Sequence, residues 1–137
     1  MKLLNLRSLA GLRGDESGAA AVEFAIVSSA FITFMFGIAY AGIMLHTNAS
    51  LQWAVETTIR RAAINPSVTQ TQLTTTLNGY LDTTHLPHAT SVSYTITAGT
   101  PPVANLTASF QRQFTIPFVA TFNTTYTATA RMSQNAS

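Results

Sequence analysis

The first half of the chain is dominated by one long pattern of apolar positions. An almost uninterrupted apolar run extends from Ala19 to Leu45, and an apolar stripe at helical spacing continues beyond it. The stripe consists of Leu51, Val55, Ile59 and Ala62 or Ala63. No breaker occurs before Asn65-Pro66, where the residue before proline disfavours helical geometry. The pattern predicts one continuous helix, apolar all round at first and amphipathic afterwards.

Residues 67–82 show a weaker helical pattern. Ser67 followed by Gln70 is typical of a capping box at a helix N-terminus. A partial apolar face follows, made of Val68, Leu73, Leu77, Tyr80 and Leu81. These features predict a second, shorter helix.

The rest of the chain alternates between apolar and polar residues, which is typical of strands. The three alternating runs are Val92 to Ala98, Leu106 to Ile116 and Tyr126 to Met132, with a turn at Gly99 to Pro102. Arg112 interrupts the apolar face of the second run and predicts a bulge or a strand end there. A three-stranded antiparallel sheet packed on the amphipathic half of the long helix would bury both apolar faces, so the predicted class is α+β.

Glu23 is the only charged residue in the run from Ala19 to Leu45. At about 1.5 Å per residue this run is long enough to cross the roughly 30 Å of membrane hydrocarbon, and it exceeds a secretory signal core. Lys2, Arg7 and Arg13 precede it, so the positive-inside rule places the N-terminus in the cytoplasm and the bulk of the chain outside. A carboxylate inside such a span is costly and must have a partner.

A cut after Gly18 would supply that partner. Glu23 would become the fifth residue of the product, one helical turn from the new α-amino group of Ala19. It would neutralise that amine, favour the positive end of the helix dipole, or pair with a neighbouring chain's amine. Further along the span, Gly37 and Gly42 permit close packing of another helix, although glycine is also simply common in membrane helices.

The residues around this junction carry a family resemblance. Gly18 followed by a small residue, with Glu23 and the aromatic Phe24 opening an apolar helix, resembles the processing site of type IV prepilins. The wider segment from Arg13 to Ala63 is similar to the TadE-like family of pseudopilins, and residues 124–132 are similar to the closing strand of that family.

The resemblance implies a minor pilin or pseudopilin of a tight-adherence (Tad/Flp) system, with a pilin-like fold. It implies cleavage at Gly18–Ala19 by a prepilin peptidase, recognition and assembly through Glu23 and Phe24, and location in a bacterial inner membrane. The implied partners are other pilins or pseudopilins, an inner-membrane platform and a secretion ATPase. The expected division is a cleaved leader at 1–18, a transmembrane helix at 19–45, an amphipathic extension at 46–64 and an extracytoplasmic domain at 65–137.

Composition argues against catalysis and nucleic-acid binding. The chain has no cysteine, a net charge of +2 and no basic stripe with interleaved aromatics. His85, His88 and Asp82 are close in sequence, but Pro87 prevents a helix from setting their spacing, so an exposed loop is expected rather than a metal site. We therefore expect no enzyme activity, cofactor or metal.

Two other readings of the chain stay open from the residues. One is a signal-anchored binding or adhesion domain unrelated to pili, and the other is an anchored enzyme with metal at His85 and His88. Trp53 fits either a membrane-interface anchor or a core residue between helix and sheet.

Overall fold

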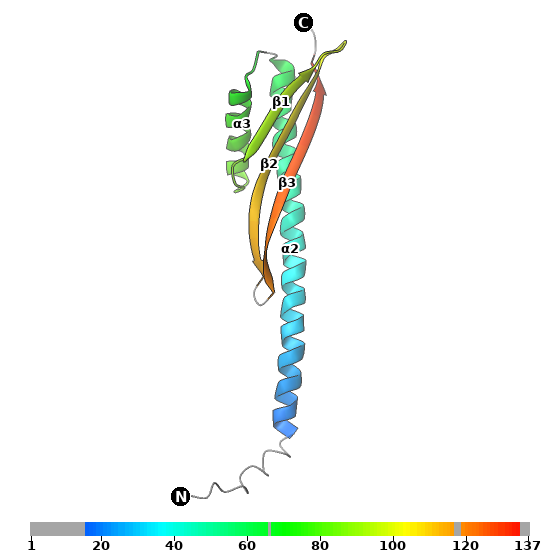
Figure 1. The fold of residues 1–137 in the computed structure, drawn as a ribbon, viewed down its shortest axis with the longest axis vertical. Helices are drawn as coiled ribbons and strands as arrows, with labels where there is room; N and C mark the ends of the chain where they lie inside the picture. The colour runs from blue at the N-terminus through cyan, green and yellow to red at the C-terminus, as the bar shows by residue number, and fades with distance from the viewer. Residues whose placement is uncertain (1–15, 66, 117–118, 135–137) are drawn as a thin grey trace, which may run out of the picture.

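The fold is dominated by a single helix, α2, that runs from Glu16 to Ile64 over 49 residues (Figure 1). The computed structural model describes residues 16–65, 67–116 and 119–134, so most of the predicted leader at 1–18 lies outside the described residues. The prediction of one continuous helix is confirmed. Arg61 lies in its last turn, where a cation favours the negative end of the helix dipole.

The C-terminal half of α2 is buried along one face only. Leu51, Val55, Ile59 and Ala62 of the predicted stripe have almost no exposed surface. Thr47, Ala54 and Thr58 are buried with them, since spacings of three and four residues place side chains on the same face. This face of α2 packs against α3 and the sheet.

A second helix, α3, spans Gln70–Thr83. The predicted capping box at Ser67 and Gln70 is wrong: the Thr69 side chain accepts a hydrogen bond from the Gln72 backbone, and the Gln72 side chain accepts one from the backbone of Thr69. Ser67 is not free to cap because its hydroxyl bonds to Asn65 Oδ1 at 2.6 Å. The helix buries Leu73, Leu77 and Leu81, whereas Val68 precedes it.

Three strands form one antiparallel sheet in the order β1-β2-β3. They are β1 at Ser91–Thr97, β2 at Val103–Ile116 and β3 at Ala120–Ser133. In the register, Leu106 of the central strand lies opposite Tyr94 on one side and Ala130 on the other. All three predicted alternating runs are confirmed as strands, although Ala98 lies just past the end of β1.

The bulge or strand end predicted at Arg112 is absent from the described strands. Arg112 pairs with Thr124, and pairing continues to Ile116 and Ala120. The side chain is only half-buried, and its guanidinium lies 5.2 Å from the centre of the Phe114 ring. A cation in this position keeps part of its solvent contact, so the strand accommodates it without a change of register.

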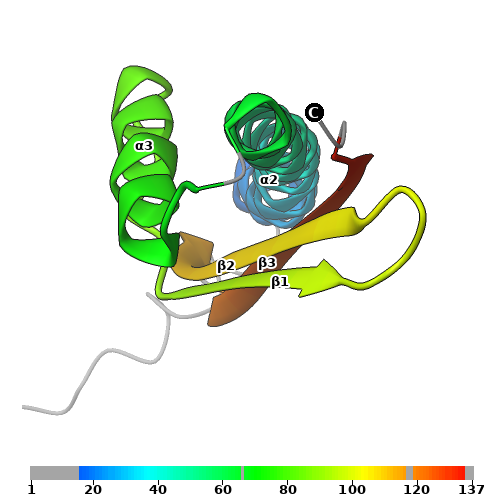
Figure 2. The ribbon, with the colours of Figure 1, turned by 90° about the horizontal axis from the view of Figure 1, so that it is seen from above.

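Both helices lie on the same side of the sheet, so the fold has two layers (Figure 2). The core between the layers contains mainly aliphatic side chains of α2 and α3 and alternate residues of β2 and β3. Phe110 is among the largest of them and stacks on Tyr126, with ring centroids 5.3 Å apart. The outer face of the sheet is polar, as shown by the Thr107–Thr129 hydroxyl contact of 3.0 Å. The predicted α+β class, with a long helix packed on a three-stranded antiparallel sheet, is confirmed.

Candidate functional site

The N-terminal half of α2 projects alone from the domain (Figure 1). Among the described residues this is the one helix long and apolar enough to cross a membrane, and its most apolar window has no buried residue. Its large side chains face outward; Phe24, for example, is 74% exposed. An apolar surface of this kind needs lipid or protein to cover it.

Gly18, Ala19, Glu23 and Phe24 lie in the first turns of this projecting helix and are all exposed. Glu23 follows Ala19 by four residues, so the two lie on the same face one turn apart. Among the described residues Glu23 has neither a hydrogen bond nor an ion pair. An added Cβ at Gly18 would meet no atom within 4 Å, so the junction is sterically open in this chain.

Gly37 and Gly42 are also open, because a Cβ added at either would meet nothing within 4 Å. Positions five apart on an α-helix point about 140° away from each other. By helical spacing, Gly37 lies on the side of α2 that carries Met44 and Leu51, and Gly42 lies on the opposite side. The two glycines therefore offer two separate approaches to the helix rather than one shared face.

The sheet reaches down to the projecting half of α2 at Tyr40. The Tyr40 hydroxyl lies 2.8 Å from Thr124 Oγ1 of β3, and its ring meets Phe114 of β2 edge to face at 4.7 Å. Met44 packs against the core one turn further on. The contact falls inside the predicted span of 19–45, so the outer part of that apolar run is shared between the candidate span and the folded domain.

Sequence reasoning did not single out Tyr40. A usable signal was present, because Tyr40 is the one tyrosine between Ala19 and Leu45 and tyrosine is enriched where membrane helices reach the interface. What the sequence could not supply was the partner, since Thr124 lies 84 positions away along the chain.

Two buried hydroxyl groups lie between α2 and the sheet. Among the described residues, Thr47 Oγ1 and the Tyr126 hydroxyl have no hydrogen-bond partner. Burial raises the pKa of the Tyr126 phenol, Tyr40 adds to this effect and Arg112 opposes it. Tyr126 therefore stays neutral at physiological pH and acts as a core residue.

The loop that holds His85 and His88 lies at the surface, where His88 contacts Asp82. His88 Nε2 lies 2.9 Å from Asp82 Oδ1, and both side chains are largely exposed. No cluster of three or more potential metal ligands occurs in the described part of the chain. His85 has a left-handed backbone with φ of 55°, which is typical of a tight turn. The three residues thus form one exposed pair and one turn residue.

Trp53 matches neither of its two predicted places. It is half-exposed on the rim between the two helices, and its ring meets Tyr80 of α3 edge to face at 5.4 Å. The residue lies more than three helical turns beyond Tyr40, so it is well away from the candidate span.

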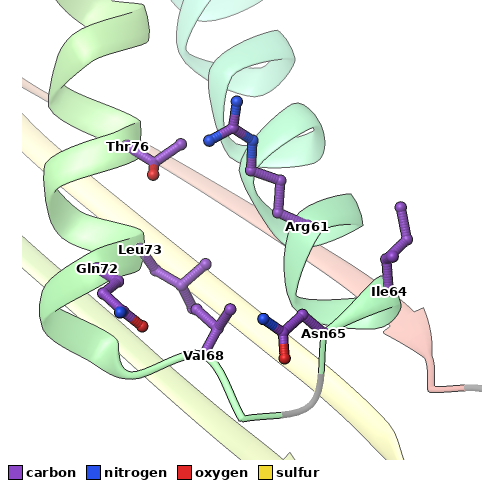
Figure 3. Close-up of a pocket in the computed structure, with 7 residues that line it drawn as sticks. All are labelled: Arg61, Ile64, Asn65, Val68, Gln72, Leu73 and Thr76. Atoms are coloured by element: carbon purple, nitrogen blue, oxygen red, sulfur yellow. The ribbon is translucent and has the colours of Figure 1, made fainter.

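A groove lies at the far end of the domain, where α2 passes into α3 (Figure 3). Arg61 and Ile64 line it from α2, and Gln72, Leu73 and Thr76 line it from α3, with Asn65 and Val68 between. Arg61 also lies over the Tyr80 ring at 5.8 Å. The groove is open and shallow, and it contains no acid–base pair.

The projecting half of α2 thus carries an exposed glycine junction, followed by Glu23 as the one charged residue between Ala19 and Leu45. Residues 18–60 match the family model described as TadE-like protein. This segment, about a third of the chain, is similar to the TadE-like family. A search of curated proteins and a search of solved structures each gave no significant match.

The TadE-like match covers most of α2 and none of the sheet. The matched family is associated with the Tad pilus and is structural rather than enzymatic. A single-pass helix at the N-terminus agrees with a membrane-associated pilin. The TadE-like segment thus contains Gly18, Glu23, Phe24 and Tyr40, and the amphipathic half that binds the sheet.

Proposed function

We propose that this TadE-like protein is a minor pilin or pseudopilin that acts in assembly, priming or tip formation of a Tad/Flp pilus. It is cleaved after Gly18 by a prepilin peptidase on the cytoplasmic side of the inner membrane. The observation that carries the proposal is the bare apolar half of α2, which begins at this junction and holds one carboxylate, Glu23, with no partner among the described residues.

The junction is suited to processing because it lies at the end of the helix. The first backbone N–H groups of any helix lack internal partners, and glycine costs about 1 kcal/mol relative to alanine within a helix. Gly18 is the third residue of α2 and nothing packs against it. The first turn therefore opens at low cost, and a peptidase gains access to an extended backbone.

Cleavage supplies the missing partner of Glu23. The new amine at Ala19 lies about 6 Å along the helix axis from Glu23, within reach of a flexible carboxylate. A pair within one chain makes the buried charge tolerable, and a pair with a neighbour's amine brings two subunits into register. The exposed apolar side chains around it, including Phe24, then pack against other pilins or pseudopilins.

The remaining partners follow from this role. Before assembly the subunit is held in the inner membrane with its sheet domain outside, as the three basic residues before the span indicate. An inner-membrane platform and a secretion ATPase extract it. No chemistry is required of the domain itself, whose described residues form a packed core.

The first experiment is the mass and N-terminal sequence of the membrane-extracted protein, with and without the candidate peptidase. A start at Ala19 that depends on the peptidase is expected. A start at Met1 in both strains would refute processing and leave a signal-anchored domain outside any pilus system.

The role of Glu23 is tested by Glu23→Ala, with Glu56→Ala as the matched control. Glu56 is exposed on the same helix and, among the described residues, accepts a side-chain hydrogen bond from Gln52 alone, at 2.9 Å. Glu23→Ala should be processed normally but fail to support piliation, whereas Glu56→Ala should support both. Normal piliation by Glu23→Ala would remove the assembly role given to this carboxylate. Gly18→Leu should instead block processing.

A further inference from the structure

The β2–β3 hairpin is longer than the core needs. Strand β1 pairs with β2 only as far as Ser109, and β2 and β3 continue together to Ile116 and Ala120. This extension runs further toward the N-terminal end of α2 than β1 or α3 does (Figure 1). We call its described residues, 114–116 and 119–122, the hairpin end.

The hairpin end has two chemically different faces. Phe114, Ile116 and Phe122 share the face directed toward α2, and Val119 follows in the turn. Val119 is 53% exposed and Phe122 is 42% exposed, so these apolar side chains are not fully covered by the helix. The outer face is polar, with Thr115 and Thr121 in hydroxyl contact at 3.1 Å.

Tyr40 fixes the hairpin end at a defined height on α2. The helix rises about 32 Å from Ala19 to Tyr40, which is close to the roughly 30 Å thickness of the hydrocarbon core. If Ala19 lies at one boundary of the hydrocarbon, Tyr40 lies at the other. The hairpin end is two residue pairs, about 7 Å, from Phe114 along the strands, so it lies close to this boundary.

Deep insertion is excluded by the backbone of the hairpin. In this extension each strand is paired on one side only, so unpaired backbone N–H and C=O groups line both outer edges. Such groups are not tolerated when they face hydrocarbon, and the Arg112 guanidinium and the outer threonines are costly there as well. The headgroup region satisfies these polar groups and still accepts apolar side chains.

We infer that the hairpin end rests in the headgroup region of the outer leaflet and sets the depth to which α2 inserts. The occupant of this surface is a phospholipid bilayer, because the hairpin end adjoins the helix segment that is itself bare and apolar. Tyr40 and Arg112 are residue types that favour this region, with apolar bodies and polar ends. The inference rests on the proposed function in requiring that α2 spans a membrane with the sheet domain outside.

The absence of cysteine makes the test direct, since one introduced cysteine carries a unique label. Val119→Cys probes the hairpin end and Val27→Cys probes the bare helix. Ile96→Cys is the matched control, because Ile96 is similarly exposed, at 48%, but pairs with Ala104 near the start of β2, at the opposite end of that strand from the hairpin end. Each full-length variant is labelled with bimane and reconstituted in vesicles of phosphatidylethanolamine and phosphatidylglycerol.

Quenching by lipid-attached nitroxides then reports depth. Val119 should be quenched several-fold more by headgroup nitroxides than Ile96, and Val27 should be quenched most by nitroxides deep in the acyl chains. Equal quenching of Val119 and Ile96, with Val27 deep, would overturn the inference and leave the membrane anchor intact. Loss of deep quenching at Val27 would instead refute the anchor.

A second copy of the chain is the competing occupant of the same surface. If the Val119 signal is due to lipid, it should not change when the protein is diluted in excess vesicles. A second copy would shield Val119 from the lipid-attached nitroxides, so weak quenching that rises on dilution would assign the surface to contact between copies and overturn the inference.

Discussion

Phe110→Ala tests the central contact between the helices and the sheet. Phe110 is 1% exposed and stacks on Tyr126, and its strand position places it toward α2. Phe122, on the same face of the same hairpin, is 42% exposed and lies outside the core cluster. The pair Phe110→Ala and Phe122→Ala therefore compares one chemical change at two depths.

The expected magnitudes differ clearly. Truncation of a buried phenylalanine costs about 3–5 kcal/mol, and the stacked contact favours the upper part of this range. Phe122→Ala should cost only about 1 kcal/mol, because much of its apolar surface already meets solvent. A domain of about ninety residues has a free energy of unfolding of roughly 5–14 kcal/mol, so Phe110→Ala removes a large share of it.

Urea unfolding of the full chain in detergent micelles measures this difference. Trp53 is the only tryptophan and contacts Tyr80 across the two helices, so its fluorescence reports loss of the fold. With a slope of about 1.5 kcal/mol per M, the Phe110→Ala midpoint should fall by about 2–3 M. Midpoint shifts of equal size for the two variants would refute the core described above.

Three further changes test local features of the domain. Thr69→Ala should lower the free energy of unfolding by about 1 kcal/mol because the capping box with Gln72 is lost. Thr69→Ser keeps a hydroxyl at this position and should retain most of the wild-type stability. Thr47→Val should raise it by about 1 kcal/mol, since a buried hydroxyl without a partner is removed; destabilisation in the same urea assay would contradict this. Burial raises the folded pKa of Tyr126, so its neutral form is favoured and stability is lost as pH rises above about 10. Tyr126→Phe should reduce that alkaline loss in a pH series, and an unchanged series would show that Tyr126 does not titrate differently in the two states.

Much of the fold was predictable because it follows from short-range periodicity. Leu51, Val55 and Ile59 recur at helical spacing, and the residues of β2 alternate with a period of two. These patterns state which side of an element is buried. They were sufficient for the helix, the three strands and the two-layer packing, and they identified Glu23 as a lone charge in an apolar run.

Errors arose where local patterns had more than one solution. Ser67 with Gln70 and Thr69 with Gln72 both satisfy the capping pattern, and only the Ser67–Asn65 hydrogen bond removes the first of them. Arg112 interrupts the apolar face of its strand in the sequence, and this interruption predicted a bulge or strand end. In the structure it lies over Phe114 where the sheet has passed the end of β1, so the surrounding space was decisive.

The amino-acid sequence by itself determined the order of the elements, the buried face of each and the position of the glycine–glutamate junction, since all of these are encoded within a few neighbouring residues. Only the tertiary structure decided how far the β2–β3 hairpin descends along α2. That depth depends on Tyr40 meeting Phe114 and Thr124, and such contacts between distant positions are set by the packing of whole layers rather than by any local period.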